Sequence, residues 1–294
     1  MKVSEINIYP IKSLAGIPLE SAIVERRGLR FDRRWMLTDK EGLFFTQREV
    51  PAMATIAVGL TEGGLVVSAN GFEDIQIPFE PDLGERLQVR VWRSEVLAEV
   101  YRGAVSEWFS DVLRRNCKLV RMPEYAERHV SERFDRGDDI VSFADGYPLL
   151  LIGEGSLAEL NERLQGRYHS EEYGEKLPLP MNRFRPNIVV QGSDPFEEDG
   201  WARIKVREAI FRVVKPCARC VVTTVDQKRG EFDGKEPLKT LAGFRMAKDV
   251  FPDKFEELGQ TANAVLFGEN LIPDNPGASV RIGDEIEILE SRRL

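Results

Sequence analysis

Short β-rich runs separated by turn residues fill the first hundred residues, and their spacing constrains the fold more than any other feature. Glycine, proline, asparagine and charged residues lie between the runs, as is typical of antiparallel sheets with short connections. The predicted strands cover residues 3–9, 21–25, 35–39, 55–58, 65–68, 87–92 and 96–101. This part of the chain is therefore predicted to form an antiparallel meander or a small barrel.

A helix and a second β-rich block follow. The helix is predicted from apolar residues that repeat on one helical face, namely Val105, Trp108, Phe109, Val112 and Leu113. The charged and aperiodic stretch 125–139 predicts an exposed connector. Beyond it we expect a helix from residue 155 and strands over residues 149–152, 187–190, 210–214, 221–226, 264–268 and 280–289. The predicted fold class is β-rich α+β.

Composition excludes several classes of protein. The 294 residues include 41 basic and 49 acidic ones, and a net charge of -8 argues against broad nucleic-acid binding through phosphates. No apolar run approaches the roughly 20 residues that a bilayer span requires, so no membrane partner is expected. Three cysteines do not make a disulfide framework, and the opening residues 1–5 do not resemble a signal peptide. We therefore expect a cytoplasmic protein.

Cys217 and Cys220 form a Cys-x-x-Cys pair that leads into the β-branched run 221–226, which predicts a strand. Thioredoxin-type pairs instead precede a helix, whose dipole lowers the thiol pKa. A zinc site would need about four ligands, and the remaining cysteine and histidine residues are only Cys117, His129 and His169. A thiolate at this position suits one soft metal whose other ligands come from elsewhere. Two reduced, half-buried strand cysteines are the alternative, and the spacing alone favours it.

Five short motifs occur in order along nearly the whole chain. They are Tyr9-Pro10-Ile11-Lys12-Ser13, Gly28-Leu29-Arg30-Phe31-Asp32-Arg33-Arg34-Trp35, Arg183-Phe184-Arg185-Pro186-Asn187, Cys217-Ala218-Arg219-Cys220 and Lys235-Glu236-Pro237-Leu238. Each motif is weak alone, but the ordered set is specific. Together they resemble MOSC-domain proteins, and more narrowly the branch with an N-terminal MOSC β-barrel domain that includes the mitochondrial amidoxime reducing component and its bacterial relatives.

The resemblance implies a fold and a cofactor. The fold would be an N-terminal β-barrel-like domain over residues 1–120, followed by a MOSC-type β-barrel domain with a few peripheral helices over residues 121–294. The family binds the molybdenum cofactor, a pterin whose dithiolene holds the metal and whose phosphate needs cationic groups. No four-cysteine cluster is present, so no iron-sulfur cluster is expected in this chain.

The resemblance also assigns residues to the site. Cys220 would be the catalytic residue and the molybdenum ligand, with Cys217 as a neighbour and Arg219 keeping the thiolate charged. The implied cofactor-binding residues are Lys12, Ser13, Arg33, Asp145, Gly146, Tyr147, Arg185, Asn187 and Arg219. Bidentate guanidinium groups are strong phosphate donors, and main-chain donors from a glycine turn would serve at residues 145–147. A solvated surface cation is the alternative for any single basic residue.

The implied function is a molybdenum-cofactor-dependent oxidoreductase that reduces N-hydroxylated small molecules. Its electrons would come from a separate donor protein that carries a flavin, a haem or an iron-sulfur cluster. MOSC domains also occur fused to cofactor sulfurases, so a cofactor carrier or sulfur-transfer module without reductase turnover is one alternative. A β-rich ligand-binding or disulfide-exchange protein that uses Cys217 and Cys220 as a redox pair is another.

Overall fold

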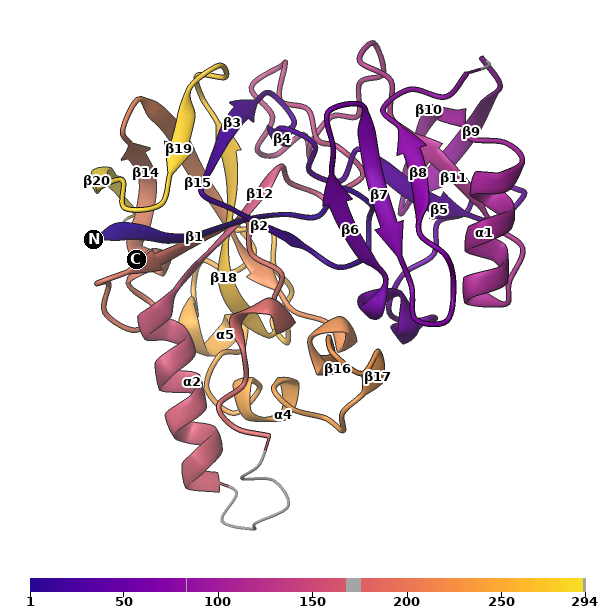
Figure 1. Cartoon of the computed structure of the whole chain (residues 1–294). Helices are drawn as coiled ribbons and strands as arrows, with labels where there is room; N and C mark the ends of the chain where they lie inside the picture. The colour runs from indigo at the N-terminus through magenta and orange to yellow at the C-terminus, as the bar shows by residue number, and fades with distance from the viewer. Residues whose placement is uncertain (83, 168–175, 293–294) are drawn as a thin grey trace.

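The computed structural model describes residues 1–82, 84–167 and 176–292, so His169 lies outside the described residues. Figure 1 shows two lobes side by side. Most of the segment drawn in purple and magenta forms the first lobe, and the orange and yellow segments form the second lobe. The first strand, drawn in indigo, lies in the second lobe beside strands from the end of the chain.

An eight-stranded sheet, counted within the described residues, forms the second lobe in the order β2-β1-β13-β12-β18-β15-β14-β20. Its strands are β1 (Lys2–Ile8), β2 (Ile17–Leu19), β12 (Leu149–Gly153), β13 (Ile188–Gln191), β14 (Trp201–Val206), β15 (Ala209–Ala218), β18 (Leu266–Pro273) and β20 (Ile286–Ser291). β1 runs antiparallel to β13, whereas β12 and β13 run parallel. The pairing of β1 with β13 brings the segment after Ile8 next to the segment before Ile188.

A smaller sheet in the order β19-β3-β4 packs beside the eight-stranded one. Its strands are β3 (Ser21–Glu25), β4 (Gly28–Leu29) and β19 (Ser279–Arg281). Residues of β3 alternate between buried and exposed, which is the period of two that a half-buried strand shows. Val24 of β3 packs in the same core as Ile6, Leu151 and Phe211 of the large sheet.

The first lobe contains two antiparallel sheets and a helix (Figure 1). The sheets have the orders β5-β11-β10-β9 and β6-β7-β8. The elements are β5 (Trp35–Thr38), β6 (Ala57–Leu60), β7 (Gly64–Ser68), β8 (Ile75–Pro78), β9 (Arg86–Val91), β10 (Ser94–Val100), α1 (Ala104–Leu113) and β11 (Lys118–Arg121). Trp35, Met53, Val67 and Phe109 are buried in a core that this lobe builds for itself. Each such side chain contributes about 1.5–3 kcal/mol relative to staying exposed.

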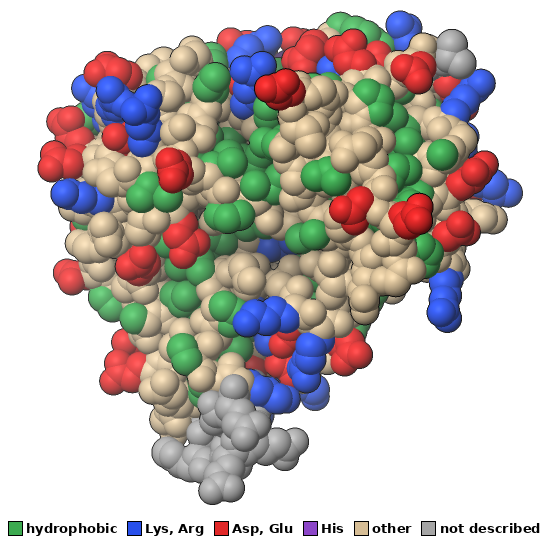
Figure 2. Space-filling view, viewed as in Figure 1, with side chains coloured by type: hydrophobic (Ala, Val, Ile, Leu, Met, Phe, Trp, Pro, Cys, Tyr) green, Lys and Arg blue, Asp and Glu red, His purple; other side chains and the backbone are tan. Residues whose placement is uncertain are grey.

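Helices and short turns surround the second lobe. They are α2 (Glu154–Arg167), α4 (Leu238–Leu241) and α5 (Ala247–Val250), the 3-10 turns η2 (Met181–Arg183), η3 (Glu197–Gly200) and η4 (Val221–Thr224), and the hairpin strands β16 (Val225–Asp226) and β17 (Glu231–Phe232). The 3-10 turn η1 (Pro51–Thr55) belongs to the first lobe, whose core includes its Met53. On the face shown in Figure 2, Lys and Arg side chains gather in the lower part, where Figure 1 places α4 and the hairpin. Among the described helices, none has the length and apolar character to span a bilayer.

The structure confirms the β-rich α+β fold class, and three predicted elements are wrong. Residues 221–226 form the turn η4 and the short strand β16, because Thr223 and Thr224 hydroxyls donate to the carbonyls of Cys220 and Val221 at 2.9 and 2.8 Å. Such local bonds compete with a strand ladder. The predicted strand 280–289 is two strands separated by Gly283, whose φ is +88°. Residues 55–58 end η1 and begin β6.

Candidate functional site

A solvent-open cleft receives residues from both halves of the chain. Its lining includes every residue that the sequence nominated, namely Lys12, Ser13, Arg33, Asp145, Gly146, Tyr147, Arg185, Asn187, Cys217, Arg219 and Cys220. Thr46, Arg48, Arg183, Thr223 and Asn270 also line it and were not nominated. The structure therefore gathers the nominated residues in one place, although they lie up to 208 positions apart in the sequence (12 against 220).

Arg33 and Arg185 are held against the buried ring of Tyr9. Their guanidinium carbons lie 4.3 and 4.1 Å from the ring centroid, and the Tyr9 hydroxyl donates to the carbonyl of Pro186 at 3.2 Å. Burial raises the pKa of Tyr9 to about 12, against the opposing effect of the two arginines. Burial lowers the pKa of Arg185 to about 10, which still leaves it charged at neutral pH. One rigid ring thus sets the position of both cations.

Asn187 and Asp32 complete this corner of the cleft. Arg33 donates to the Asp32 carboxylate at 2.7 Å and to the Asn187 side-chain oxygen at 3.0 Å. The Asn187 amide nitrogen donates to the carbonyl of Asn7, and the backbone N–H of Leu150 donates to its oxygen. Asn187 therefore has three partners within the protein and serves to orient Arg33.

Three nominated residues have a backbone that non-glycine residues seldom adopt. Ser13, Arg33 and Arg185 have φ values of 70°, 49° and 57°. A left-handed conformation costs a non-glycine residue about 1 kcal/mol or more and persists where the surrounding structure enforces it. Its occurrence at three positions of one cleft indicates that this cleft was shaped for binding.

Lys12 and Asp145 form an ion pair in the lining of the cleft. The Lys12 ammonium lies 2.5 Å from a carboxylate oxygen of Asp145 and donates to the carbonyl of Phe143 at 2.8 Å. Burial lowers the pKa of Lys12, and Asp145 opposes that change. Desolvation raises the pKa of Asp145, but Lys12 and Arg48 lower it to well below its usual range. Asp145 is therefore an anion at neutral pH.

Buried Arg128 shapes the chain segment that precedes Asp145. Its guanidinium donates to the carbonyls of Ser142, Ala144 and Asp145. Burial lowers the pKa of Arg128 to about 10, so it stays charged. A glycine requirement at Gly146 is not supported, because its φ is not positive and an added Cβ would meet no atom within 4 Å. Tyr147 packs edge-on against Phe134.

Arg48, which the sequence did not nominate, contacts the sulfur of Cys220. Its Nη2 donates to Cys220 Sγ at 3.0 Å, and its guanidinium stacks over the ring of Trp92 at 4.5 Å. Trp92 in turn donates from its indole nitrogen to Asp145 at 3.2 Å. Arg48 lies in no recognised motif and 172 positions from Cys220, so the sequence carries no signal for this contact.

Arg219, which was expected to keep the Cys220 thiolate charged, forms its sulfur contact with the neighbouring Cys217. Arg219 donates to Cys217 Sγ at 3.1 Å and to the carbonyl of Phe184 at 2.6 Å. Cys220 stands at the start of η4, where the chain turns, so its side chain and that of Arg219 diverge. Within the described residues, no group of three His, Cys, Asp or Glu side chains could hold a metal ion.

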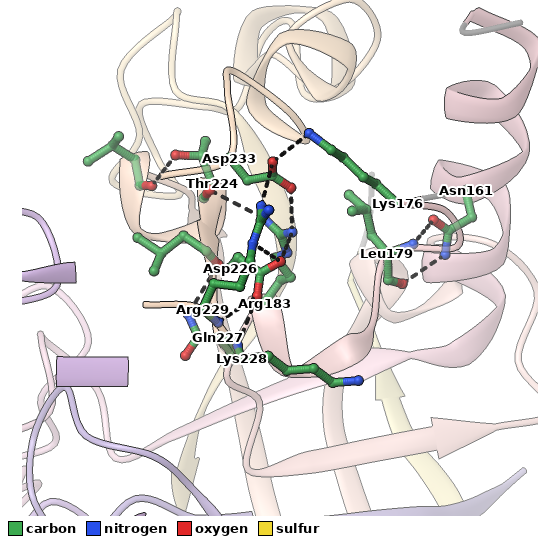
Figure 3. Close-up of polar contacts among 12 residues, drawn as sticks. Asn161, Lys176, Leu179, Arg183, Thr224, Asp226, Gln227, Lys228, Arg229 and Asp233 are labelled. Carbon is green, nitrogen blue, oxygen red and sulfur yellow. Dashed lines mark hydrogen bonds and ion pairs between the residues drawn. The ribbon is translucent and has the colours of Figure 1, made fainter. Parts of the chain in front are cut away.

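Behind the cleft, Arg183 is neutralised by two carboxylates. Figure 3 shows it between Asp226 and Asp233, at 3.4 and 2.9 Å. Lys176 and Arg229 also bind Asp233. Arg183 therefore acts mainly as a link between η2 and the β16–β17 hairpin, unlike Arg185, which lines the cleft and forms no ion pair within the described residues.

Charge describes what the cleft can bind. Six cationic side chains line it, namely Lys12, Arg33, Arg48, Arg183, Arg185 and Arg219, against the single carboxylate of Asp145. Two thiols lie at one wall. A polyanionic ligand satisfies such a cluster, and a thiolate is a suitable donor to a soft metal.

Comparisons with known proteins agree with this geometry. Residues 1–116 match the MOSC N-terminal beta barrel domain, and residues 138–287 match the MOSC domain. Mitochondrial amidoxime-reducing component 1 of Mus musculus is 30% identical over 98% of this chain and 82% of its own length. The protein of the same name from Homo sapiens matches to the same extent. Molybdenum cofactor sulfurase of Oryza sativa subsp. japonica is 34% identical over 84% of this chain, which spans 31% of that protein.

Proposed function

The chain belongs to the MOSC family, and from this membership we propose that it is a molybdenum-cofactor-dependent reductase of N-hydroxylated small molecules. One observation carries the proposal. Cations from residues 12 and 33 and from residue 185 line the same cleft as the Cys220 thiol. The printed name of the mammalian relatives, amidoxime-reducing component, supports the substrate class.

The donors of the cleft fit the proposed cofactor. Arg33, Arg185 and Lys12 would hold its phosphate, because guanidinium and ammonium groups donate to phosphate and the two arginines are fixed by Tyr9. Ser13 adds a hydroxyl at the same wall. Cys220 would supply the protein thiolate to the metal, and Arg48 would stabilise the negative charge on that sulfur.

When bound, the cofactor would supply the two-electron chemistry that cleaves an N–O bond. The chain's own residues would bind, orient and shield the reactants. Arg48 and Asp145 line the cleft with partly exposed side chains and would offer a donor and an acceptor to a small polar substrate. Arg219 would stay on Cys217 and keep that second thiol away from Cys220.

Electrons would come from a separate donor protein with a flavin, a haem or an iron-sulfur cluster. The described residues contain no cluster of metal-binding side chains that could relay them. The proposed cellular location is the cytoplasm, as the cysteine content suggests.

The proposal is tested by expressing the full chain in a host that makes the pterin cofactor. We expect about one molybdenum per chain and reduction of benzamidoxime with a chemical electron donor. Molybdenum-loaded protein that reduces no N-hydroxylated compound would overturn the proposal. A host that lacks the cofactor pathway serves as the control and should yield inactive protein.

A second function is a cofactor carrier or sulfur-transfer module. The match to molybdenum cofactor sulfurase, at 34% identity over 84% of this chain, favours it. Such a module would carry a persulfide on Cys220 and would not turn over benzamidoxime. Mass spectrometry of the intact protein before and after a sulfur donor is added separates the two functions.

A further inference from the structure

We infer that Arg48 and Trp92 orient the substrate at the cleft entrance, and that they select N-hydroxylated compounds with a flat, apolar body. Arg48 donates hydrogen bonds to the N–O oxygen, and Trp92 stacks against the body. This inference rests on the proposed function, because it assigns two residues of the first lobe to the substrate of the same site.

Arg48 has hydrogen-bond donors to spare beside Cys220. A guanidinium carries five N–H groups in one plane, and among the described residues the Arg48 side chain donates a single hydrogen bond, to Cys220 Sγ at 3.0 Å. The nearest carboxylate oxygen, of Asp145, is 3.8 Å away and too distant for a hydrogen bond. Arg48 lines the cleft with 26% of its side chain exposed. Its remaining donors are therefore available to a ligand that lies next to the sulfur.

Trp92 is a large apolar side chain that the fold holds in an exposed position. It is 46% exposed and stands in the turn between β9 and β10 with a φ of 58°. Three contacts fix its ring: the Arg48 guanidinium at 4.5 Å, the edge of Phe44 at 5.1 Å, and the bond from its indole nitrogen to Asp145 at 3.2 Å. Trp92 does not itself line the cleft, but it contacts two residues that do, Arg48 and Asp145. A fixed and exposed aromatic ring beside these residues is a surface on which flat ligands stack.

Arg48 connects the Cys220 sulfur with the ring of Trp92, because it contacts both. Arg48 touches Cys220 with one nitrogen and covers Trp92 with its plane. A ligand whose oxygen accepts from Arg48 therefore has its oxygen beside Cys220 and its body toward Trp92. Amidoximes with an aromatic substituent have this shape, and their oxygen accepts hydrogen bonds.

A matched pair of the same chemistry provides the control. Arg86 stacks over Tyr125 at 5.2 Å in the first lobe, and Tyr125 is 56% exposed. Neither Arg86 nor Tyr125 lines the cleft, whereas Arg48 lines it and Trp92 contacts the lining residues Arg48 and Asp145. Arg86→Gln and Tyr125→Ala remove the same kinds of group as Arg48→Gln and Trp92→Ala.

The experiment measures equilibrium binding to molybdenum-loaded protein by calorimetry, without a reductant, so that no turnover occurs. The ligands are benzamidoxime and acetamidoxime, which share the N-hydroxyamidine group and differ in the phenyl ring. Arg48→Gln should lower the affinity for both ligands by about tenfold, because one charged hydrogen bond is lost. Trp92→Ala should lower the affinity for benzamidoxime by about three- to tenfold and that for acetamidoxime by less than about twofold. The affinity of Arg48→Lys for both ligands should lie between those of Arg48→Gln and the wild type.

Each other result overturns a defined part of the inference. Equal binding in Arg48→Gln and Arg86→Gln would remove the role of Arg48, and equal loss of both ligands in Trp92→Ala would remove the apolar preference. A molybdenum content that falls in Arg48→Gln would make Arg48 a cofactor residue instead. Wild-type protein that holds molybdenum and binds neither ligand would overturn the substrate class of the proposed function itself.

Discussion

The cleft is lined mainly by cationic side chains, whereas a far cluster in the second lobe is built around buried carboxylates. The cleft holds Arg33 and Arg185 around Tyr9 with an opening to solvent. The far cluster encloses three buried carboxylates, Glu198, Asp199 and Glu269, together with Arg245 and Arg292. Burial raises the pKa of all three acids, most strongly that of Glu269.

The difference lies in how each group can lose its charge. A buried carboxylate becomes neutral by taking up a proton, so an acid cluster can close on itself. A guanidinium stays protonated in proteins, so a cluster of arginines needs an anion. The far cluster contains its own cations, Arg245 and Arg292, whereas Arg185 and Arg219 of the cleft form no ion pair within the described residues and would be satisfied by an anionic ligand.

Removing a cation from the far cluster, which we call the closed cluster, should have the largest effect on stability. Arg245 binds Asp199 at 2.7 Å and is 5% exposed. Arg245→Gln leaves a buried acid without its cation and should lower the free energy of unfolding by about 3–5 kcal/mol. Urea unfolding measures this, and the molybdenum content per folded chain should not change. Arg163→Gln, which removes a half-exposed guanidinium stacked over Phe244, should cost less than about 1 kcal/mol.

Removing the Cys220 sulfur from the cleft should abolish turnover of benzamidoxime and leave the fold intact. Cys220→Ser should lose more than about a hundredfold in turnover of benzamidoxime, because a metal ligand is lost. Cys217→Ser should keep its molybdenum, since Cys217 contacts Arg219 and not the Arg48 side of the cleft. Elemental analysis and steady-state rates measure both, and equal losses in the two variants would contradict the assignment of Cys220.

Removing one cation from the cleft should reduce retention of the cofactor strongly and the free energy of unfolding only slightly. Arg185→Gln should retain about tenfold less molybdenum after gel filtration. The loss of its bond to the Leu14 carbonyl should lower the free energy of unfolding of cofactor-free protein by only about 1 kcal/mol. Arg115→Gln removes a guanidinium stacked on Phe45 outside the cleft and should change neither quantity measurably. An equal molybdenum content in both variants would refute the phosphate-binding role.

The smallest expected effect is the pH dependence of the closed cluster. The raised pKa of Glu269 means that the folded state binds a proton more tightly than the unfolded state, whose pKa is near 4.5. Its contribution to stability is full below that pH and is lost as pH rises through the raised pKa. Glu269→Gln should therefore make stability fall less steeply with pH above 4.5, as urea unfolding at several pH values would measure. An unchanged slope would show that Glu198 and Asp199 carry the effect.

The sequence predicted where strands lie along the chain better than it predicted which strands pair in a sheet. The alternation in β3 and the apolar run of β12 identify strands locally, because burial on one or both faces is a property of neighbouring residues. The pairing of β1 with β13 joins residues more than 180 positions apart and has no local signal. The β-branched run after Cys220 was misinterpreted, because hydroxyl bonds of Thr223 and Thr224 to the backbone outweigh β propensity.

Some residues of the site were also identified from the sequence, and others only from the structure. Motifs located Lys12, Arg33, Arg185 and Cys220, and the cleft contains all of them. Arg48 was missed because it is one of 41 basic residues, and only its contact with Cys220 distinguishes it. The domain boundary at residue 120 stays a prediction.

By itself, the sequence determined the fold class and the residues that motifs mark, because periodicity and motif chemistry are local properties of the chain. Only the tertiary structure decided which cation meets which sulfur and which charges stay without a counter-ion. Those relations depend on distances between segments that the sheet brings together, and electrostatic interactions depend on distance and burial.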